Sequence, residues 1–374
     1  TGSFSPAEAN DLAVVHRAGA LPAPVIVEEE RTVGALLGAD SIKSGINATL
    51  IGAILVFVFM IAYYRLAGLV ANMALILNLL IILACLAMFR GTLTLPGIAG
   101  LILTIGMSVD ANVLIYERIR EELKNGKSLR AAISAGYHRA FSAIIDSNLT
   151  TIVAALLIFK FGSGPIRGFA VTLTIGLLAN MFTAVTCTRV IFELMCDQFG
   201  LTKLGMMQLF PETKLDFIGK RRVFYALSAI IIIIGLSVFG MRGEANYGVD
   251  FSGGTLQQYL FQKPVAMDAV RSALKEIDLG GASLQQYGNP KEIIVKTQKD
   301  ESKRLKELFA QKFPDNTFET LRVETVGPAV GKNLRQNAIT SLLLGLGGIL
   351  LYVMFRFNLK YAIAGVVAIF HDVL

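Results

Sequence analysis

The sequence predicts a polytopic α-helical membrane protein that carries one small α+β domain outside the membrane. Three observations predict this fold class. Hydrophobic residues make up 54% and charged residues only 17% of the 374 residues, and the mean hydropathy is +0.59. The apolar residues are gathered in runs of about 20 residues, the length that a helix needs to cross a bilayer. One long polar segment, Arg242–Arg335, separates the last two complete runs.

Seven apolar runs are long enough to be complete spans, and an eighth begins near Tyr361 and continues to Leu374. The fourth run is longer than one bilayer crossing, so we expect part of it to tilt or to lie at the interface. The predicted spans are Ile46–Tyr64, Val70–Phe89, Pro96–Tyr116, Ala131–Phe159, Gly168–Leu194, Val223–Met241 and Gln336–Phe355.

The distribution of basic residues predicts the orientation of these spans. The short loops and flanks on one side contain fourteen Lys and Arg residues, whereas the short loops on the opposite side contain three. Basic loops stay on the cytoplasmic side, so we expect Gly126 and Gly205 to be cytoplasmic. The N-terminal segment and Arg242–Arg335 are then expected outside. The net charge of +7 is explained by these loops, and nucleic acid is not an expected partner.

The polar segment between the last two complete spans alternates short strand and helix patterns in the order βαββαβ, the ferredoxin-like pattern. Ile293 and Val295 should face the helices, because alternate residues of a strand share a face. Such a fold supports many activities and does not by itself indicate a function. The predicted strands are Thr255–Phe261, Ser283–Tyr287, Glu292–Lys296 and Thr317–Thr325, and the predicted helices are Ala266–Ile277 and Glu301–Lys312.

The chain also contains an internal repeat. The element Thr-Val-Gly-x-x-x-Gly starts at Thr32, before the first span, and again at Thr325, before the seventh. Each copy is followed by a span that ends in an arginine after aromatic residues, and the Val-to-Arg separations are 32 and 30 residues. Chance similarity of apolar helices is the alternative, but the repeated element is not itself apolar. The pattern therefore indicates a parallel duplication about an axis along the membrane normal.

Asp110 is the first candidate for chemistry, because it lies well inside the third predicted span. An ionised carboxylate is costly there and usually faces a bundle interior or water. Proton uptake removes that cost, so the group could accept a proton from one side and release it to the other. Gly106 lies one turn away on the same face and is expected to let another helix approach closely. A structural role for a paired aspartate is the alternative, although a neutral side chain would serve it at lower cost.

Asp146 begins a second polar patch, Asp146–Thr151, inside the fourth run. It is the weaker candidate for the same proton or ion relay, and a structural hydrogen-bonding role is equally compatible with the sequence. In the next span, Asn180, Thr183 and Thr186 could add neutral partners. The threonine hydroxyls are expected to bond back to their own helix instead.

No residue pattern points to a metal or a cofactor, and we expect neither. His16, His138 and His371 are scattered, and the three cysteines have neither metal-ligand nor redox spacing. The glycine-rich segment Tyr247–Thr255 indicates a tight turn into the first strand. It lacks the Lys-Ser/Thr pair of a phosphate-binding loop.

Several segments resemble the SecD and SecF protein-export membrane proteins. Leu95–Glu122, with its Gly-Met-Ser-Val-Asp-Ala-Asn motif around Asp110, resembles the SecD signature closely. Residues 17–24 resemble the end of the SecD outer domain, and Asn246–Gly254 resembles the opening of SecF after its first span. Phe370–Leu374 resembles the third SecF span, so the resemblance covers essentially the whole chain.

The resemblance implies a member of the RND superfamily, whose fused forms have twelve spans in two halves. It implies a motor that uses a proton or sodium gradient, without covalent catalysis, to promote late preprotein translocation across the bacterial plasma membrane. Asp110 would be its relay residue, and Asp250, Gly253 and Gly254 would be motif residues of the outer domain. The implied partners are a SecY-type channel, an unfolded preprotein, YajC- and YidC-type membrane proteins and the lipid bilayer.

The resemblance also implies a division of the chain. Because Thr1 is not an initiator, we expect an interior piece of a longer protein, with the SecF counterparts of Asp110 beyond Leu374. The expected parts are the tail of a SecD-like outer domain and a linker (1–42), a SecD-like bundle of five spans (43–197), a cytoplasmic linker (198–222), the first SecF-like span (223–241), a ferredoxin-like outer domain (242–334) and further SecF-like spans (335–374).

Three other functions are compatible with a polytopic protein. An RND-type small-molecule exporter is the main alternative, but two large outer loops would be expected, and the second loop here has only about 90 residues. An intramembrane aspartyl protease needs a close pair of carboxylates, and neither Asp110 nor Asp146 lies in a Gly-x-Gly-Asp motif. A purely structural subunit would leave Asp110 unexplained.

Overall fold

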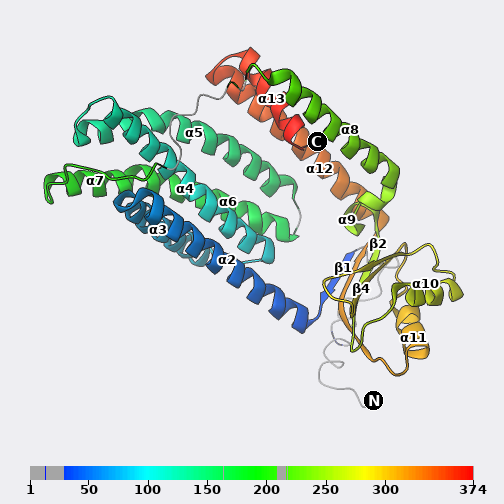
Figure 1. The fold of residues 1–374 in the computed structure, drawn as a ribbon. Helices are drawn as coiled ribbons and strands as arrows, with labels where there is room; N and C mark the ends of the chain where they lie inside the picture. Colours follow the sequence, from blue (N-terminus) through cyan, green and yellow to red (C-terminus); the bar gives the residue numbers. More distant parts are fainter. Residues whose placement is uncertain (1–12, 14–28, 163, 209–215, 217, 374) are drawn as a thin grey trace. The chain divides into compact units, whose positions relative to one another are not determined.

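A computed structural model describes residues 29–162, 164–208 and 218–373, together with residues 13 and 216. The chain divides into two compact units, and each is described by itself. The sheet unit contains the described residues up to Gly34 together with Tyr247–Lys332, and the helical unit contains Ala35–Asn246 and Asn333–Leu374. Figure 1 shows the elements of both units. Residues 17–24, which carry part of the family resemblance, lie outside the described residues.

The helical unit confirms the predicted spans. Within the described residues, seven helices are long and apolar enough to cross a membrane. The fifth of these spans contains a π-helical turn, which the sequence did not predict. The elements are α2 (Ala35–Tyr64), α3 (Leu66–Met88), α4 (Leu95–Lys124), α5 (Leu129–Phe161), α6 (Gly164–Phe182), the π-turn η1 (Thr183–Cys187), α7 (Thr188–Asp197), α8 (Arg221–Arg242), α12 (Pro328–Arg356) and α13 (Leu359–Val373).

The helices extend beyond the predicted spans, because hydropathy marks the apolar part of a helix and not its ends. At the start of α4, the Thr94 hydroxyl accepts a hydrogen bond from the backbone N–H of Gly97 at 3.2 Å, as an N-cap residue does. At its other end α4 continues past Tyr116 to Lys124. The turn that follows contains Gly126 with φ 83°, a conformation that glycine adopts at little cost.

Helices α3, α4 and α5 supply most of the buried core of the helical unit. Tyr64, Tyr116 and Phe192 form a chain of aromatic contacts, with ring centroids 5.5 and 5.8 Å apart. By contrast, α8 buries no residue, and its many exposed side chains are apolar. Lipid and neighbouring spans both tolerate such a surface, because lipid tails are as apolar as leucine.

The predicted orientation can be tested by single-cysteine labelling of the full-length protein in a cysteine-free background. Asn125 is a better cytoplasmic probe than Gly126. The φ angle of Gly126 is 83°, and a cysteine placed there would be strained, as any residue with a Cβ is at such an angle. We expect Asn125→Cys and Gly205→Cys to be protected from an impermeant thiol reagent added outside, and Gln285→Cys to react with it. Labelling of Asn125→Cys from outside would contradict the orientation.

The sheet unit confirms the predicted βαββαβ order. Its strands lie in the order β1-β5-β2-β4-β3, and every neighbouring pair is antiparallel. A short helical segment precedes the sheet strands β2–β5. After η2 (Gly243–Asn246), which ends the first part of the helical unit, the elements are α9 (Val249–Ser252), β2 (Gly254–Phe261), α10 (Met267–Glu276), β3 (Ser283–Gln286), β4 (Glu292–Thr297), α11 (Ser302–Lys312) and β5 (Phe318–Val326).

The edge strand β1 (Glu29–Val33) was not predicted. It pairs with β5 so that Arg31 lies opposite Glu324 and Thr32 opposite Val323. Both copies of the Thr-Val-Gly repeat therefore have the same local structure: a strand that ends at the valine, a glycine, and then a long helix. The two strands of the repeat are neighbours in one sheet, which makes β1 part of a domain built mainly from the far end of the chain.

The core of the sheet unit lies between the sheet and its two longer helices. Ile293 and Val295 are fully buried and belong to the same apolar cluster as Val270 of α10 and Leu305 and Phe309 of α11. This confirms the predicted inward face of β4. It also shows why the two helices lie on one side of the sheet, because the alternate residues of the strands offer only one apolar face to cover.

We expect the segment Glu244–Thr325 to fold by itself, since its core cluster is complete within it. Burial raises the pKa of the Tyr259 phenol, so this group loses its proton more easily in the unfolded chain than in the folded one. The unfolded chain then binds fewer protons above about pH 10, and the free energy of unfolding should fall there by up to about 1.4 kcal/mol per pH unit.

Circular dichroism of the fragment during urea unfolding at several pH values measures this effect. Tyr259→Phe should keep the cooperative transition and lose this part of the fall above about pH 10. A gradual transition of the unchanged fragment at neutral pH would contradict independent folding.

Candidate functional site

Asp110 lies at the middle of α4 on a face that the other described helices leave uncovered. Leu103, Gly106 and Leu114 are exposed as well. They are separated from Asp110 by three- or four-residue steps, the spacing of one helix face. The Asp110 carboxylate makes no hydrogen bond or ion pair with any described residue. An intramembrane acid almost always faces other spans or water, so this face is the one at which a further element or solvent must meet Asp110.

The expected close helix approach at Gly106 is not present among the described residues. A Cβ added to Gly106 would meet no atom within 4 Å. The prediction was wrong for the described helices because they pack on the other side of α4. Close approaches occur there instead: a Cβ on Gly100 would lie 3.3 Å from the carbonyl oxygen of Phe169, and one on Gly176 would lie 2.6 Å from Thr104 Oγ1.

The opposite face of α4 carries a buried cluster of amides. The Asn78 side chain of α3 donates to Ser108 Oγ, Asn112 donates to the Ser108 carbonyl at 3.0 Å, and Asn180 of α6 donates to another α4 carbonyl at 3.4 Å. These bonds attach α3 and α6 to one turn of α4, next in sequence to Asp110. They fix the rotation of α4 and so the direction in which Asp110 points.

The same three amides have buried oxygens without a hydrogen-bond partner among the described residues: Oδ1 of Asn78, Asn112 and Asn180. A buried carbonyl oxygen of this kind normally accepts a hydrogen bond from a protein group or from an ordered water. The interior of the bundle beside α4 therefore contains polar atoms within an otherwise apolar membrane unit.

Asp146 has a different environment from Asp110, because its carboxylate is surrounded by donors. Arg356 Nε lies 2.9 Å from Asp146 Oδ1, and the Tyr352 hydroxyl donates to the same oxygen at 2.6 Å. The Ser142 hydroxyl lies 3.5 Å from Asp146 Oδ2 and also contacts the Arg356 guanidinium. Asp110 is not among these partners, so the two aspartates do not form the dyad that an aspartyl protease requires.

The neutral residues expected beside Asp146 contact other groups. Asn180 bonds to α4, and the Thr183 hydroxyl bonds back to the Asn180 carbonyl at 3.3 Å, as expected for a threonine in a helix. Thr183 opens the π-helical turn η1. Such turns are rare and are frequently found at functional sites.

Two acidic residues hold the basic end of α4. Glu117 pairs with Arg120 at 2.8 Å and also accepts a hydrogen bond from the Tyr64 hydroxyl at 2.9 Å. Glu122 is only 2% exposed and lies 2.6 Å from Lys127 Nζ and 2.8 Å from an Arg139 guanidinium nitrogen. The Glu122 contacts join the end of α4 to the turn and to α5, so this end anchors the hairpin rather than offering a free charged surface.

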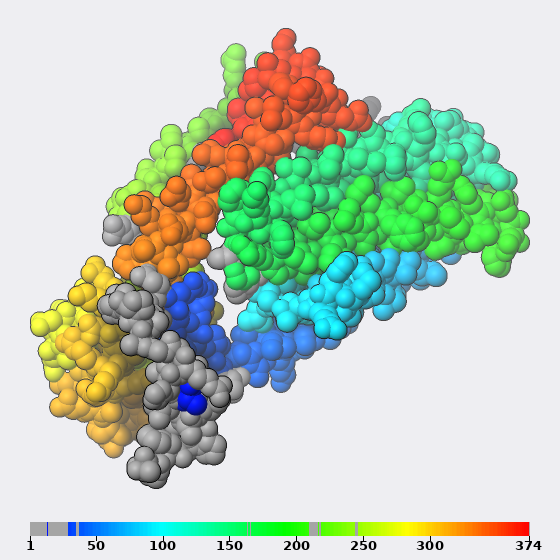
Figure 2. All heavy atoms as spheres, turned by 180° about the vertical axis from the view of Figure 1, so that it is seen from behind, coloured from blue at the N-terminus to red at the C-terminus, as the bar shows by residue number. Residues whose placement is uncertain are grey.

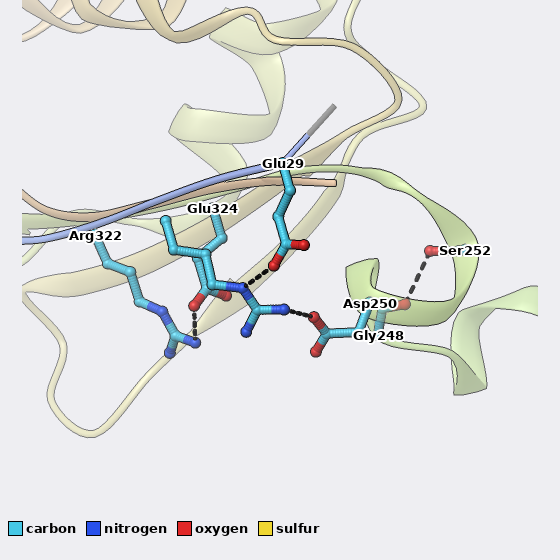
Figure 3. A network of polar contacts seen from close by, with 7 residues as sticks. Glu29, Gly248, Asp250, Ser252, Arg322 and Glu324 are labelled. Atoms are coloured by element: carbon cyan, nitrogen blue, oxygen red, sulfur yellow. Dashed lines mark hydrogen bonds and ion pairs between the residues drawn. The ribbon is translucent and has the colours of Figure 1, made fainter. Parts of the chain in front are cut away.

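Asp250 lies in α9 and binds the edge strand β1. Its Oδ1 is 2.7 Å from Arg31 Nη2, and Arg31 Nε is 2.8 Å from Glu29 Oε1. Burial opposes the charge of Arg31, but Asp250 and Glu29 outweigh it and hold the pKa of this guanidinium above its usual value. Glu324, opposite Arg31 on β5, is paired with Arg322 at 2.6 Å. Figure 3 shows the contacts that run from β1 to Asp250 of α9 and, beside them, the separate Arg322–Glu324 pair.

Gly253 and Gly254 form the predicted tight turn between α9 and β2. Their φ angles are 76° and 110°, and a Cβ on Gly254 would lie 2.4 Å from the Thr297 carbonyl oxygen. A Cβ on Gly253 would lie 3.2 Å from Pro328 Cα, and one on Gly331 would lie 3.1 Å from the Gly253 backbone nitrogen. The two turn glycines therefore let the chain pass close to β4 and to the first turn of α12.

The sequence alone did not identify the two arginines that bind the candidate aspartates, Arg356 beside Asp146 and Arg31 beside Asp250. Arg356 was recognised only as a basic flank of the seventh span, and Arg31 lay in a segment with no predicted element.

His371 and Asp372 near the end of α13 form a polar pair, with Nδ1 and Oδ1 3.2 Å apart. His371 also contacts the Ser228 hydroxyl of α8. No group of three or more His, Cys, Asp or Glu side chains among the described residues is placed to hold a metal ion.

Comparison with known proteins identifies the family. The model for the protein export membrane protein SecD/SecF, C-terminal family, matches residues 21–197 and 305–374. A protein translocase subunit SecD of Syntrophobacter fumaroxidans is 63% identical over 206 residues, which are 55% of this chain and 39% of that protein. A protein translocase subunit SecDF of Brucella abortus is 34% identical over 380 residues, covering 100% of this chain and 50% of that protein.

The fold agrees with these matches. The crystal structure of SecDF, a translocon-associated membrane protein from Thermus, superposes with a TM-score of 0.87 at 39% identity, covering 100% of this chain and 51% of that one. The chain thus spans half or less of the length of the sequence relatives named above. The family match includes α4 with Asp110 and α5 with Asp146. This integral membrane chain belongs to the SecD/SecF family of protein-export membrane proteins.

Proposed function

We propose that this chain is the central part of an accessory motor of bacterial protein export, which uses a proton or sodium gradient to promote late preprotein translocation across the plasma membrane. Membership of the SecD/SecF family supports protein export as the process. The family relatives are named as translocase subunits, and transport rather than covalent catalysis is the corresponding activity.

The single observation that carries the ion-driven part of the proposal is the setting of Asp110. It is the acid at the middle of a 30-residue helix, and no described side chain neutralises it or donates to it. The buried amides on the other face of α4 hold this helix in one rotation against α3 and α6. A carboxylate with no fixed partner can gain and lose an ion without first breaking a protein contact.

The proposed mechanism couples that ion exchange to packing. With an ion bound, Asp110 is neutral and an apolar neighbour can close over the uncovered face of α4. Without it, the charged carboxylate favours water or a cation on that face. If the two occupancy states favour two arrangements of the spans, an ion gradient across the membrane drives the arrangements in one direction.

We assign the relay to Asp110 and not to Asp146. The Asp146 carboxylate already binds Arg356 and Tyr352, and these contacts would have to break in each cycle. The Asp250, Gly253 and Gly254 turn is proposed as the part that keeps β1 attached to the sheet, so that the strands before α2 and before α12 respond together. The proposed partners are a SecY-type channel and an unfolded preprotein on the outer side, with YajC- and YidC-type proteins as further membrane partners.

The proposal is tested with the full-length protein in sealed vesicles that contain a Sec channel and its ATPase. Translocation of a preprotein is measured with and without an imposed ion gradient, and vesicles that lack the protein are the control. We expect the gradient to increase late translocation only when the protein is present, and ionophores for protons and for sodium to identify the ion. An equal response to the gradient in vesicles that lack the protein would contradict the proposal.

The exporter alternative predicts a different result in the same vesicles. A small-molecule exporter would move a dye or a hydrophobic cation under the gradient and leave preprotein translocation unchanged. Parallel measurement of dye efflux therefore separates the two functions.

A further inference from the structure

The contacts of Asp146 join two parts of the helical unit that are far apart in the sequence. Asp146 lies on α5, and Arg356 and Tyr352 lie on the last two turns of α12, more than two hundred positions later. Asp146 is only 15% exposed, whereas Arg356 is 45% exposed, so the guanidinium reaches a carboxylate that is itself enclosed. Figure 2 shows α12, in orange, beside the green α5.

The contact continues along both helices away from the ion pair. A Cβ on Gly348 would lie 3.2 Å from Val153 Cγ1, and one on Gly345 would lie 3.7 Å from Leu157 Cδ1. The residue numbers rise on α5 as they fall on α12, so the two helices run antiparallel. Small residues allow such close approach of spans, and polar side chains add hydrogen bonds between them.

On α12 the contact residues have a regular spacing, Gly-x-x-Gly-x-x-x-Tyr-x-x-x-Arg from Gly345 to Arg356. Steps of three and four residues place all four side-chain positions on one helix face. The two glycines allow close contact of the helices. The tyrosine and the arginine add a hydrogen bond and an ion pair, both at one end of the interface. An interface of this kind fits its partner in one direction and in one register.

We propose that this α5–α12 contact is the recognition surface that joins the first five spans to the seventh, and that the Asp146–Arg356 pair fixes its register. The partner that the α5 surface accepts is an antiparallel apolar span with two closely spaced glycines followed by an aromatic hydroxyl and a cation. Setting register is the best-attested role of polar or ionic groups enclosed between helices, and the Asp146 carboxylate is enclosed in this way. The junction holds its geometry while Asp110 exchanges its ion elsewhere.

The register argument depends on what a one-turn shift would do. Sliding α12 by one turn moves its residues by about 5.4 Å along α5, which separates Arg356 from Asp146 and places a larger side chain where at least one of the two glycines lies. Contacts between purely apolar side chains lose less on sliding, since they contain no directed hydrogen bond. The polar end therefore adds register specificity to the close approach that the glycines allow.

Disulfide cross-linking of the full-length protein in native membranes tests this proposal. The background lacks the native cysteines and carries a protease site in the segment between α7 and α8. Val153→Cys with Gly348→Cys reports the register, and cleavage followed by a non-reducing gel shows whether the two pieces are joined. SDS removes all non-covalent contacts, so only the disulfide can hold them together. Val153→Cys with Leu343→Cys is the control pair, because Leu343 is 62% exposed.

We expect rapid cross-linking of the first pair and none of the control pair. Asp146→Asn and Arg356→Gln should each slow the cross-linking by about tenfold, the range of polar contacts between spans, and Tyr352→Phe by less. If the two charged residues act through each other, the double variant should be no slower than either single variant. Glu193→Gln, which removes an exposed pair within α7, should leave the rate unchanged.

Three results would overturn the proposal. The first is failure of the first pair to cross-link, and the second is an unchanged rate in Asp146→Asn. The third is a double variant whose slowing equals the product of the two single effects, because Asp146 and Arg356 would then act independently. The assay reads the positions of helices and not transport, so it remains informative if the ion-driven function is disproved.

Discussion

Asp110→Asn in the full-length protein is expected to remove the gradient-dependent part of preprotein translocation and to leave the gradient-independent part intact. Asparagine has the shape of aspartate but has no carboxylate that can bind an ion. The described neighbours on its face make no contact that the change would disturb. Insertion and folding should therefore be preserved, which makes the loss attributable to the missing charge.

A carboxylate on a longer side chain should retain part of the activity. Asp110→Glu can still bind and release an ion, although its carboxylate is displaced by one methylene. Glu193→Gln serves as the control that removes an acid from an exposed pair at the end of the bundle, where such pairs contribute little. The measurement is the ratio of translocation rates with and without the gradient, which should fall to one in Asp110→Asn and stay at the unmodified value in Glu193→Gln.

Gly254→Ala is expected to destabilise the sheet unit by about 2 kcal/mol or more, through backbone strain at positive φ and a steric clash. Gly254 has φ 110°, and the new Cβ would lie 2.4 Å from the Thr297 carbonyl oxygen. Because this oxygen belongs to the backbone of β4, it cannot rotate away as a side chain would. The pairing of β2 with β4 must therefore open at this end.

Hydrogen exchange of the β2 and β4 amides in the full-length protein measures this loss, and we expect about thirtyfold faster exchange through the weakened pairing. Gly281→Ala is the matched control, because a Cβ there would meet nothing within 4 Å. Its exchange should match that of the unmodified protein. Equal protection of β2 in Gly254→Ala would show that the turn tolerates a side chain and that the close approach to β4 is not required.

A more modest change is expected from the salt bridge that attaches β1. Arg31→Gln removes the contacts with Asp250 and Glu29, whose side chains are 44% and 43% exposed. Exposed pairs of this kind contribute about 1 kcal/mol at most. We expect faster exchange of the β1 amides, with the amides of β2 and β4 unchanged. Equal acceleration throughout the sheet would contradict a local role.

The spans and the elements of the sheet unit could be predicted because they depend on local patterns. A run of apolar residues is costly in water wherever it occurs, and the alternation of Ile293 and Val295 indicates a buried strand face by itself. The strand β1 could not be predicted in this way. Its five residues are all exposed, and three of them are charged. Only its pairing with β5, far along the chain, makes it a strand.

The candidate sites also differ in whether a local pattern or a contact between distant residues reveals them. Asp110 could be recognised from the sequence alone because an acid within an apolar helix is unusual anywhere in a membrane protein. The role of Asp146 could not be derived, since the sequence does not show that Arg356 reaches it. The error at Gly106 has a related cause: helical spacing shows that Gly106 and Asp110 share a face, but it does not show which side of α4 the neighbouring helices cover.

The most direct test of the ion-driven function is the flux of ions during translocation. Sealed vesicles with the full-length protein are loaded with a pH-sensitive or a sodium-sensitive dye, and ion movement is followed while a preprotein crosses the membrane. We predict a flux that begins with translocation, stops when the preprotein is exhausted and is absent in Asp110→Asn. A flux of unchanged size in Asp110→Asn would contradict the account, because ions would then cross without the carboxylate that is proposed to carry them.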